Sequence, residues 1–390
     1  MSKRLEAEVW SLDNCAGCGL CVAACSKQVL EWEPGTLHPV LQKRTKLLGL
    51  SRTPLDSCSF CTQLCVESCP RLERWAEMEP RLVTAARARG PVFSGAPNDV
   101  IRAILAAGRS SGLLDGVVML DLDPWTLQPV ARVVTTVEQI VETMGPQYLW
   151  APVFDALNEA VFTHHMQNVA VVGTPCAAQA IRKLRQSTNP RLRPYQESIR
   201  LSIAIFCTGI YKPEMIEEVL VKRMNVSRDQ VKRLEISPDR EWMRAVLWDG
   251  SVRTIPRQQA ESYTRSGCGK CDDYLGESAD LAVGSLGAPK DASTLIVRSL
   301  AGDIFARNAV QMGLLETSPD VDIAALEKAA SEKDRRERGQ AFKDLEILML
   351  DGLADPQKRA EAIQQFTRLY RTPARPGAVG PDVPRGCTGC

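Results

Sequence analysis

NVAVVGTPCAAQAIRKL, residues 168–184, contains the change of pattern that decides the fold. Its first half is a short apolar run ending in Gly-Thr, typical of a buried strand, and its second half has helical spacing. Thr174 suits the N-cap of a helix and Pro175 its first position. Cys176 then falls in the first helical turn, where the helix dipole favours a thiolate. The stretch predicts a strand, a turn and a helix, with a cysteine just beyond the strand.

A second apolar strand, LSIAIF at 201–206, runs directly into Cys207. In open α/β sheets, ligands bind outside the carboxyl ends of the strands. Cys176 and Cys207, together with the Cys268-Gly-Lys-Cys271 loop, therefore form a plausible four-thiol site. The alternative for Cys176 and Cys207 is that they are buried structural cysteines.

The flanking segments continue the α/β pattern. We expect helices over 99–114, 137–144 and 153–166, strands over 115–122 and 131–136, a hairpin over 241–257, two strands around a glycine-rich loop over 279–299 and a charged helix over 323–350. Residues 372–386 are rich in proline and glycine and are predicted to be extended. The chain thus divides into a cysteine-rich unit (1–85), an α/β unit (86–320) and a charged helix with a tail (321–390).

Eight cysteines lie in two complementary runs, CAGCGLCVAAC at 15–25 and CSFCTQLCVESCP at 58–70. In two-cluster ferredoxins, three thiolates on a short loop bind one cubane cluster, and the fourth cysteine of the run ligates the other cluster. We therefore predict one [4Fe–4S] cluster on Cys15, Cys18, Cys21 and Cys69, and another on Cys25, Cys58, Cys61 and Cys65. Zinc binding, or a set of unrelated thiols, is the alternative.

Composition limits the class of protein. The 390 residues carry a net charge of +1, so no strongly basic surface points to nucleic acid. No apolar run is long enough to span a membrane, and the first residues lack the apolar core of a secretory signal. We expect a cytoplasmic protein without direct membrane insertion. Its 14 cysteines then indicate metal rather than disulfides, while only three histidines (38, 164 and 165) leave little for histidine chemistry.

Neither a GxGxxG fingerprint nor a P-loop is present, so a Rossmann-type NAD site is not indicated. Three short loops of small residues could still present backbone N–H groups to a pyrophosphate. They are 91–99, 172–176 and 284–293. An ordinary turn is the alternative for each of them.

The same segments resemble the family of coenzyme F420 hydrogenase/dehydrogenase beta subunits over about residues 90–330. The matching stretches include LLDGVVML, GPQYLWAPVFDAL, VAVVGTPCAAQAIRKL, FCTG, GCGKCDDYLGESADLAVGSLGAP and STLIVRS. The resemblance implies an α/β (α+β) flavoprotein domain, fused here to an N-terminal ferredoxin-like 2×[4Fe–4S] domain and a C-terminal helical tail. It also implies a third [4Fe–4S] cluster on Cys176, Cys207, Cys268 and Cys271. The candidate cofactor-binding residues are Ser94, Gly95, Tyr148, Gly173, Thr174, Gly284, Ser285, Gly287 and Ser293.

The activity implied is hydride transfer between coenzyme F420 and FAD, followed by passage of single electrons through three [4Fe–4S] clusters. The partner would be another redox subunit of a complex: a hydrogenase, a formate dehydrogenase, a heterodisulfide-reductase-like enzyme or a membrane oxidoreductase, the last giving a peripheral location at the membrane. Two alternatives stay open. One is a ferredoxin-linked reductase of another acceptor, such as a tetrapyrrole, and the other is a flavin-free electron-transfer adaptor.

Cys387 and Cys390, in the terminal PRGCTGC, are left over after these twelve. A zinc site shared with Cys268 and Cys271 would need a loop far longer than usual zinc-ribbon spacing. A mobile redox or metal-binding tail, ligands offered to a partner, and an inert tail are the other interpretations. We expect that this pair does not form a metal or cluster site with any other residue of the chain.

Overall fold

The structure is a computed structural model. It describes residues 3–33, 35–42, 61–73, 78–93, 98–143, 145, 148–237, 241–352 and 360, and only the backbone of 338 and 340–352. Cys58, Ser94, Gly95, Cys387 and Cys390 therefore lie outside the described residues.

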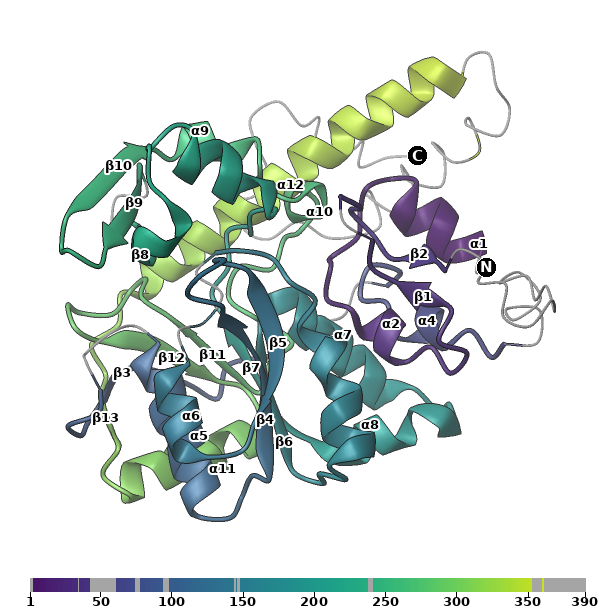
Figure 1. Ribbon diagram of the computed structural model, residues 1–390. Coiled ribbons are helices and arrows are strands. Elements are labelled where there is room, and N and C mark those ends of the chain that lie inside the picture. The colour runs from purple at the N-terminus through teal and green to yellow at the C-terminus, as the bar shows by residue number, and fades with distance from the viewer. Residues whose placement is uncertain are drawn as a thin grey trace, which may run out of the picture.

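One large sheet organises the chain (Figure 1). Its eight strands lie in the order β13-β3-β12-β11-β7-β6-β4-β5. The inner strands β4, β6, β7 and β11 run parallel, and antiparallel strands flank them on both sides. The strand bounds are β3 Leu82–Ala88, β4 Gly116–Leu122, β5 Pro129–Val134, β6 Val169–Gly173, β7 Ile199–Ile205, β11 Leu281–Gly284, β12 Ser293–Val297 and β13 Leu315–Ser318.

Helices cover both faces of this sheet, which explains why its inner strands are mainly apolar. In β4, Val117 and Met119 belong to the core beneath α5 (Asp99–Ser110) and α11 (Leu300–Gln311), together with Phe305. Val118, between them, faces the opposite core beneath α7 (Pro175–Gln186). Figure 1 shows α5, α11 and α6 (Val137–Glu142) on one side, and α7 and α8 (Arg193–Ser198) on the other.

The N-terminal unit consists of short elements beside α7 and α8 (Figure 1). It contains α1 (Lys3–Leu5), a π-helix (Glu6–Trp10), α2 (Leu20–Ala23), α4 (Leu64–Glu67) and a two-stranded sheet of β1 (Leu30–Glu31) and β2 (Val40–Leu41). The helices α2 and α4 are counterparts, since both begin Leu-Cys-Val and contact each other. Leu20 and Leu64 are buried in the same core as α7, so the unit is packed onto the α/β body.

A second sheet, β10-β9-β8, lies apart from the large one. Its strands are β8 (Val231–Ile236), β9 (Trp242–Leu247) and β10 (Val252–Pro256), and β9 and β10 form the hairpin predicted over 241–257. The short helices α9 (Gln258–Glu261) and α10 (Ser266–Gly269) follow, and α12 (Ile323–Gly352) is the predicted charged helix. Other short elements are helices at Val153–Ala156 (η2), Glu159–Thr163 (η3), Pro190–Leu192 (η4), Ile216–Val221 (η5) and Arg228–Gln230 (η6).

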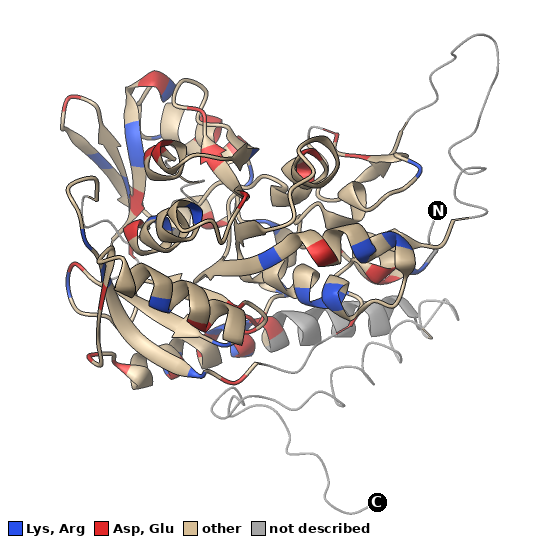
Figure 2. Cartoon of the chain, turned by 90° about the horizontal axis from the view of Figure 1, so that it is seen from below, with Lys and Arg blue, Asp and Glu red and all other residues tan. Residues whose placement is uncertain are grey.

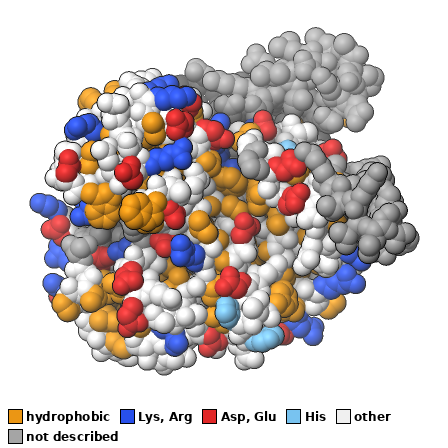
Figure 3. Space-filling view, in the orientation of Figure 1, with side chains coloured by type: hydrophobic (Ala, Val, Ile, Leu, Met, Phe, Trp, Pro, Cys, Tyr) orange, Lys and Arg blue, Asp and Glu red, His pale blue; other side chains and the backbone are white. Residues whose placement is uncertain are grey.

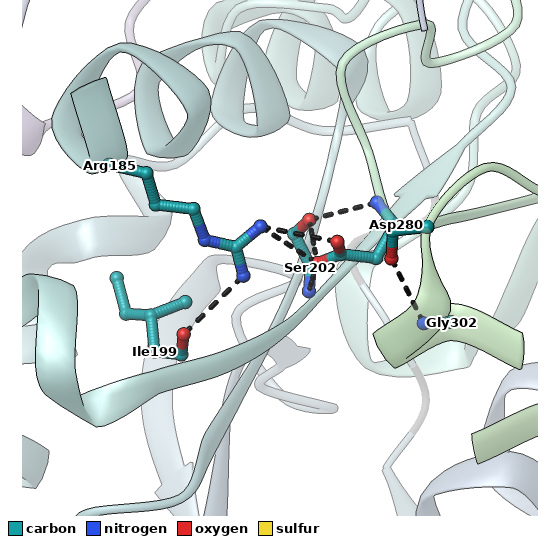
Figure 4. Close-up of polar contacts among 6 residues, drawn as sticks. Arg185, Ile199, Ser202, Asp280 and Gly302 are labelled. Carbon is teal, nitrogen blue, oxygen red and sulfur yellow. Dashed lines mark hydrogen bonds and ion pairs between the residues drawn. The ribbon is translucent and has the colours of Figure 1, made fainter. Parts of the chain in front are cut away.

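A buried polar contact ties α7 to the sheet (Figure 4). Asp280 is 3% exposed and accepts hydrogen bonds from Arg185 at 3.0 Å and from the Ser202 hydroxyl at 2.7 Å. Arg185 also donates to the carbonyl of Ile199 at 3.4 Å. These bonds join the last turn of α7 to β7 and to the residue before β11, and so fix the helix whose first turn carries Cys176.

Two predictions differ from the structure. The helix expected over 153–166 spans residues 153–163, where a 3-10 turn, η2, continues through Leu157 and Asn158 into a π-helical turn, η3. The Phe154 N–H donates to the carbonyl of Cys18 at 3.2 Å, so this hydrogen bond holds the start of the segment against the N-terminal unit. The boundary expected at 85/86 falls inside β3, which belongs to the large sheet, so the α/β unit begins by residue 82.

The surface agrees with a net charge close to zero. Figure 2 shows acidic and basic residues interspersed over the described elements. Figure 3 shows hydrophobic side chains gathered in the middle of one face. Within the described residues, no helix combines the length and apolar character that crossing a membrane requires.

Candidate functional site

A pocket of about 770 Å³, including open space at its mouth, lies at the carboxyl ends of β4, β6 and β7. Its walls are mostly apolar, as those of small-molecule and cofactor sites usually are. The lining comprises Ala16, Gly17, Cys18, Asn98, Ile101, Arg102, Met119, Leu120, Thr143, Gly145, Leu149, Trp150, Ala151, Val153, Val172, Gly173, Thr174, Cys176, Ala177, Ile205 and Ile210. The N-terminal unit and the α/β body thus build the pocket together.

Arg102 is the cation of this lining. It lies in the first turns of α5, where it donates to Asp99 at 2.8 Å and to the carbonyl of Thr143. Its side chain is 17% exposed. The sequence offers no signal for this role, because helical spacing marks only the buried face of α5.

The first thiol set, Cys15, Cys18, Cys21 and Cys69, is brought together from both cysteine runs. Burial raises the pKa of Cys69 to about 11, and the neighbouring thiol of Cys15 adds to the rise. Burial also raises the pKa of Cys21 well above its ordinary value, with Cys18, Cys15 and Cys69 contributing. The fourth cysteine of the second run therefore lies beside the first three of the first run.

The third thiol set, Cys176, Cys207, Cys268 and Cys271, also converges, although its members come from three separate segments. Burial raises the pKa of Cys176 to about 11, and Cys271 and Cys268 contribute. Burial likewise raises the pKa of Cys207. The charge of Lys333 acts to lower this pKa, and the other three thiols of the set act to raise it.

The local prediction for Cys176 needs one correction. Thr174 does occupy the N-cap position and Pro175 the first turn, but the Thr174 side chain forms no capping hydrogen bond. Its hydroxyl lies 3.1 Å from the Cys176 sulfur instead. Burial raises the pKa of Cys176 in spite of the nearby Arg71 charge, which acts in the opposite direction.

The second thiol set, Cys25, Cys58, Cys61 and Cys65, is described in part. Cys25 and Cys65 are half-buried and pack against the apolar cluster around Trp10 and Leu72. Cys61 is half-buried as well, and Cys58 lies outside the described residues.

The donor sets bear on the kind of metal centre they could hold. Among the described residues, no three His, Cys, Asp or Glu side chains form a group suited to a single metal ion. A four-iron cluster places each thiolate on a different iron, so its ligands stand further apart than those of one ion. Protons on thiols this deeply buried are replaced when a metal binds, because a coordinating thiol is deprotonated.

Four buried cations lie beside the thiols, and sequence reasoning missed them all. Lys183 is 6% exposed and acts on Cys69. Arg71 is 8%, Arg265 2% and Lys333 6% exposed. The Arg265 Nε atom is buried and has no hydrogen-bond partner, a costly arrangement unless negative charge lies nearby. An anionic cluster on either adjoining thiol set would supply that charge, so these residues fit the predicted groups.

The first and third thiol sets meet at a close backbone contact. A methyl group on Gly267 would overlap the carbonyl of Cys15, so only glycine permits the approach of these two loops. Trp150 donates from Nε1 to the carbonyl of Gly17 at 2.9 Å on the same border. The pocket touches both sets, through Cys18 and Cys176.

The predicted cofactor-binding residues divide into three groups. Gly173 and Thr174 line the pocket. Ser94 and Gly95 lie outside the described residues. Tyr148 is 39% exposed and does not line the pocket, and neither do Gly284, Ser285, Gly287 and Ser293. The last four border a loop packed against the start of α12, where the Asp322 N–H donates to the carbonyl of Gly287 at 2.8 Å.

Two family profiles match most of the α/β body. Both describe the "Coenzyme F420 hydrogenase/dehydrogenase, beta subunit": the profile of its N-terminal part matches residues 83–158, and that of its C-terminal part matches 166–323. A sheet covered by helices on both faces, with a pocket at its strand ends, places the chain in the α/β class of proteins. The chain belongs to the family of coenzyme F420 hydrogenase/dehydrogenase beta subunits.

Individual relatives extend this likeness. The chain is 32% identical over 358 residues to an uncharacterised protein of Methanocaldococcus jannaschii, covering 86% of this chain and 97% of that protein. It is 27% identical to a subunit of the F(420)H(2) dehydrogenase of Methanosarcina mazei, covering 77% of this chain and 83% of the relative. A chain of the F420-reducing [NiFe] hydrogenase complex from Methanosarcina barkeri superposes with a TM-score of 0.63 at 25% identity, covering 69% of this chain and 92% of the other.

Proposed function

We propose that this chain is an iron–sulfur flavoprotein subunit that transfers hydride between coenzyme F420 and FAD and relays single electrons to a partner redox subunit. The observation that carries the proposal is the lining of the pocket, which includes one cysteine from the first thiol set and one from the third, Cys18 and Cys176. When bound there, a flavin would exchange electron pairs with a hydride carrier and single electrons with iron–sulfur clusters.

The residues of the pocket suit a flavin. Small residues at the turn from β6 to α7, Gly173 and Ala177, leave room beside the strand ends. The α7 N-terminus lies on this wall, and helix N-terminal N–H groups favour phosphate. Arg102 adds a cation at the opposite wall. Apolar side chains such as Met119 and Ile205 exclude water from the remaining surface.

The thiols give the chain its proposed relay. The first and third sets border the same pocket, and Cys25 and Cys65 of the second set belong to the same apolar cluster as Cys15 and Cys69 of the first. With one [4Fe–4S] cluster on each set, electrons would leave the pocket through cluster sites that adjoin one another. The partner would be a further redox subunit, as the names of the hydrogenase complex and of the dehydrogenase subunit suggest for those relatives.

Protein purified without oxygen tests the proposal. We expect about twelve irons, four for each of three clusters, and one FAD released on denaturation. Reduced F420 should bleach the flavin absorbance. Iron-loaded protein without flavin would contradict the hydride-transfer role and favour an electron-transfer adaptor. If the flavin stays oxidised after reduced F420 is added, another compound must be the hydride partner. Electron transfer from ferredoxin to a tetrapyrrole would identify the alternative reductase.

A cysteine pair provides a matched test of the third thiol set. Cys268→Ser should lower the iron content by about one third, the share of one cluster in three, and leave the ferredoxin-type signals. Cys390→Ser is the control, because the terminal pair is not assigned to any cluster, and it should keep all the iron. Full iron in Cys268→Ser would reject the third site.

A further inference from the structure

Arg265 lies on the border between the first and third thiol sets. It precedes α10, the short helix that carries Cys268, and its backbone N–H donates to the carbonyl of Ile210 at 3.0 Å. Its guanidinium lies beside Gly17, where an added methyl group would come within 2.8 Å of the Arg265 Cζ. The side chain therefore reaches from the loop of the third set to the loop of the first.

The position of this guanidinium is fixed by contacts that leave its charge uncompensated. Nη2 donates to the carbonyl of Leu37 at 2.6 Å, and the Trp150 ring lies 4.1 Å from Cζ. No carboxylate of the described residues forms an ion pair with Arg265, which is only 2% exposed. A buried charge of this kind is unfavourable unless opposite charge is close. Burial lowers the pKa of Arg265, and the thiols of both sets oppose that change, Cys15 and Cys268 first.

Arg71 approaches the same border from the other side. It follows Cys69 and Pro70 in the chain and is 8% exposed. Its guanidinium donates to the carbonyl of Gly267 at 2.9 Å and to that of Lys270 at 3.2 Å. Gly267 directly precedes Cys268, and Lys270 lies between Cys268 and Cys271. A residue that lies next to Cys69, a member of the first set, thereby holds the loop of the third set.

Lys333, by contrast, serves the third set alone. This residue of α12 is 6% exposed and donates from Nζ to the carbonyls of Cys207 and Asp273, each at 2.6 Å. Burial acts to lower the pKa of Lys333, but the thiols of Cys271 and Cys207 raise it above its ordinary value. The main charges acting on Lys333 are the thiols of Cys271, Cys207 and Cys268 and the carboxylate of Asp273, all on the side of the third set. Lys333 is thus a buried cation like Arg71 and Arg265, but its contacts are with the third set.

We propose that Arg71 and Arg265 form a shared counter-charge between the first and third thiol sets, which raises the reduction potentials of both bound clusters together. This inference rests on the proposed function, since it requires clusters on both sets. A cluster on four thiolates is anionic and gains one negative charge on reduction, so a nearby cation favours the reduced form.

The shared position has a consequence for electron passage. When one electron leaves the cluster on one set and enters the cluster on the other, one centre is oxidised and the other reduced. The total negative charge facing the arginines is then unchanged, and no proton has to be taken up or released. A cation that faced one cluster only, such as Lys333, would favour the electron on that side.

Redox titration of the clusters by electron paramagnetic resonance tests the proposal. Cys268→Ser identifies the third-set signal in the spectrum by its loss, and Cys18→Ser identifies that of the first set. In Arg265→Met, we expect the ratio of reduced to oxidised cluster at a given potential to fall at least about tenfold for both clusters, which is a shift of 59 mV for one electron. Arg265→Lys should keep most of the effect because the charge is retained. Lys333→Met should lower the potential of the third-set cluster only.

The outcomes separate this inference from the proposed function. Wild-type protein without cluster iron would overturn both. Intact clusters in Arg265→Met with unchanged potentials, or with a shift confined to one cluster, would overturn the shared counter-charge and leave the proposed function standing. If Arg265→Met loses iron, Arg71→Met makes the same prediction at the other side of the border, and unchanged potentials there would refute it.

Discussion

Gly17 offers a sharp test of the border between the N-terminal unit and the α/β body. Its φ is +73°, in the left-handed region, and an added methyl group would overlap Trp150 Nε1 and come within 2.8 Å of Arg265 Cζ. Gly112, at the end of α5, has the same φ of +73° but no heavy atom within 4 Å of the corresponding methyl position. The two glycines therefore differ in crowding and not in backbone conformation.

The expected destabilisation follows from these two contributions. Placing alanine in the left-handed region costs about 1–2 kcal/mol, and this applies at both positions. Overpacking a tightly packed site adds about 1–3 kcal/mol, and this applies to Gly17→Ala alone. Movement of the Trp150 ring would also weaken its hydrogen bond to the carbonyl of Gly17, for about 1 kcal/mol. We expect Gly17→Ala to be less stable than Gly112→Ala by about 2–4 kcal/mol.

The assay is urea unfolding of both variants, prepared without oxygen, with the iron content measured beside it. Gly17→Ala should unfold at a distinctly lower urea concentration and lose iron, because Gly17 lies between Cys15 and Cys18. Gly112→Ala should retain its iron. Equal midpoints for the two variants would show that Trp150 and Arg265 do not pack against this loop as described.

Three further substitutions probe other parts of the molecule. Arg102→Met should retain at least about tenfold less flavin after dialysis, since a hydrogen bond to a charged group contributes about 1.5–3 kcal/mol. Arg109→Met is the control and should retain the flavin fully, because Arg109 lies on the same helix but outside the pocket lining. Asp280→Ala leaves Arg185 without its buried partner and should lower the free energy of unfolding by about 3 kcal/mol. The exposed pair of Glu218 and Lys222 provides the control, and Glu218→Ala should change the free energy of unfolding by at most about 0.5 kcal/mol. Phe305→Ala removes a ring that is 2% exposed between α11 and the sheet and should cost about 3–5 kcal/mol, a result that a smaller loss of stability would contradict.

Local pattern predicted the elements on which the site is built. The strand, turn and helix over 168–184 lie where the apolar run, Thr174 and Pro175 indicate them, because their signals are all within a few residues. The hairpin over 241–257 follows from strand alternation and a Trp-Asp-Gly turn for the same reason. The helix predicted over 153–166 is present over residues 153–163, but it changes from 3-10 to π geometry along its length, which local pattern did not indicate.

The sequence by itself determined the strand–helix units and the position of Cys176 beyond a strand, because these depend on short spacings and intrinsic conformational preferences. The assignment of the eight N-terminal cysteines to two clusters stays a prediction from the same kind of spacing. Only the tertiary structure decided what surrounds them. Arg71 and Gly267 are 196 residues apart in the chain and yet share a hydrogen bond, and Arg265 reaches Gly17 from the opposite unit. No local pattern encodes such contacts, since packing of the N-terminal unit onto the sheet creates them and buries their charge. That packing also places Cys18 and Cys176 on one pocket, the arrangement from which the proposed function follows.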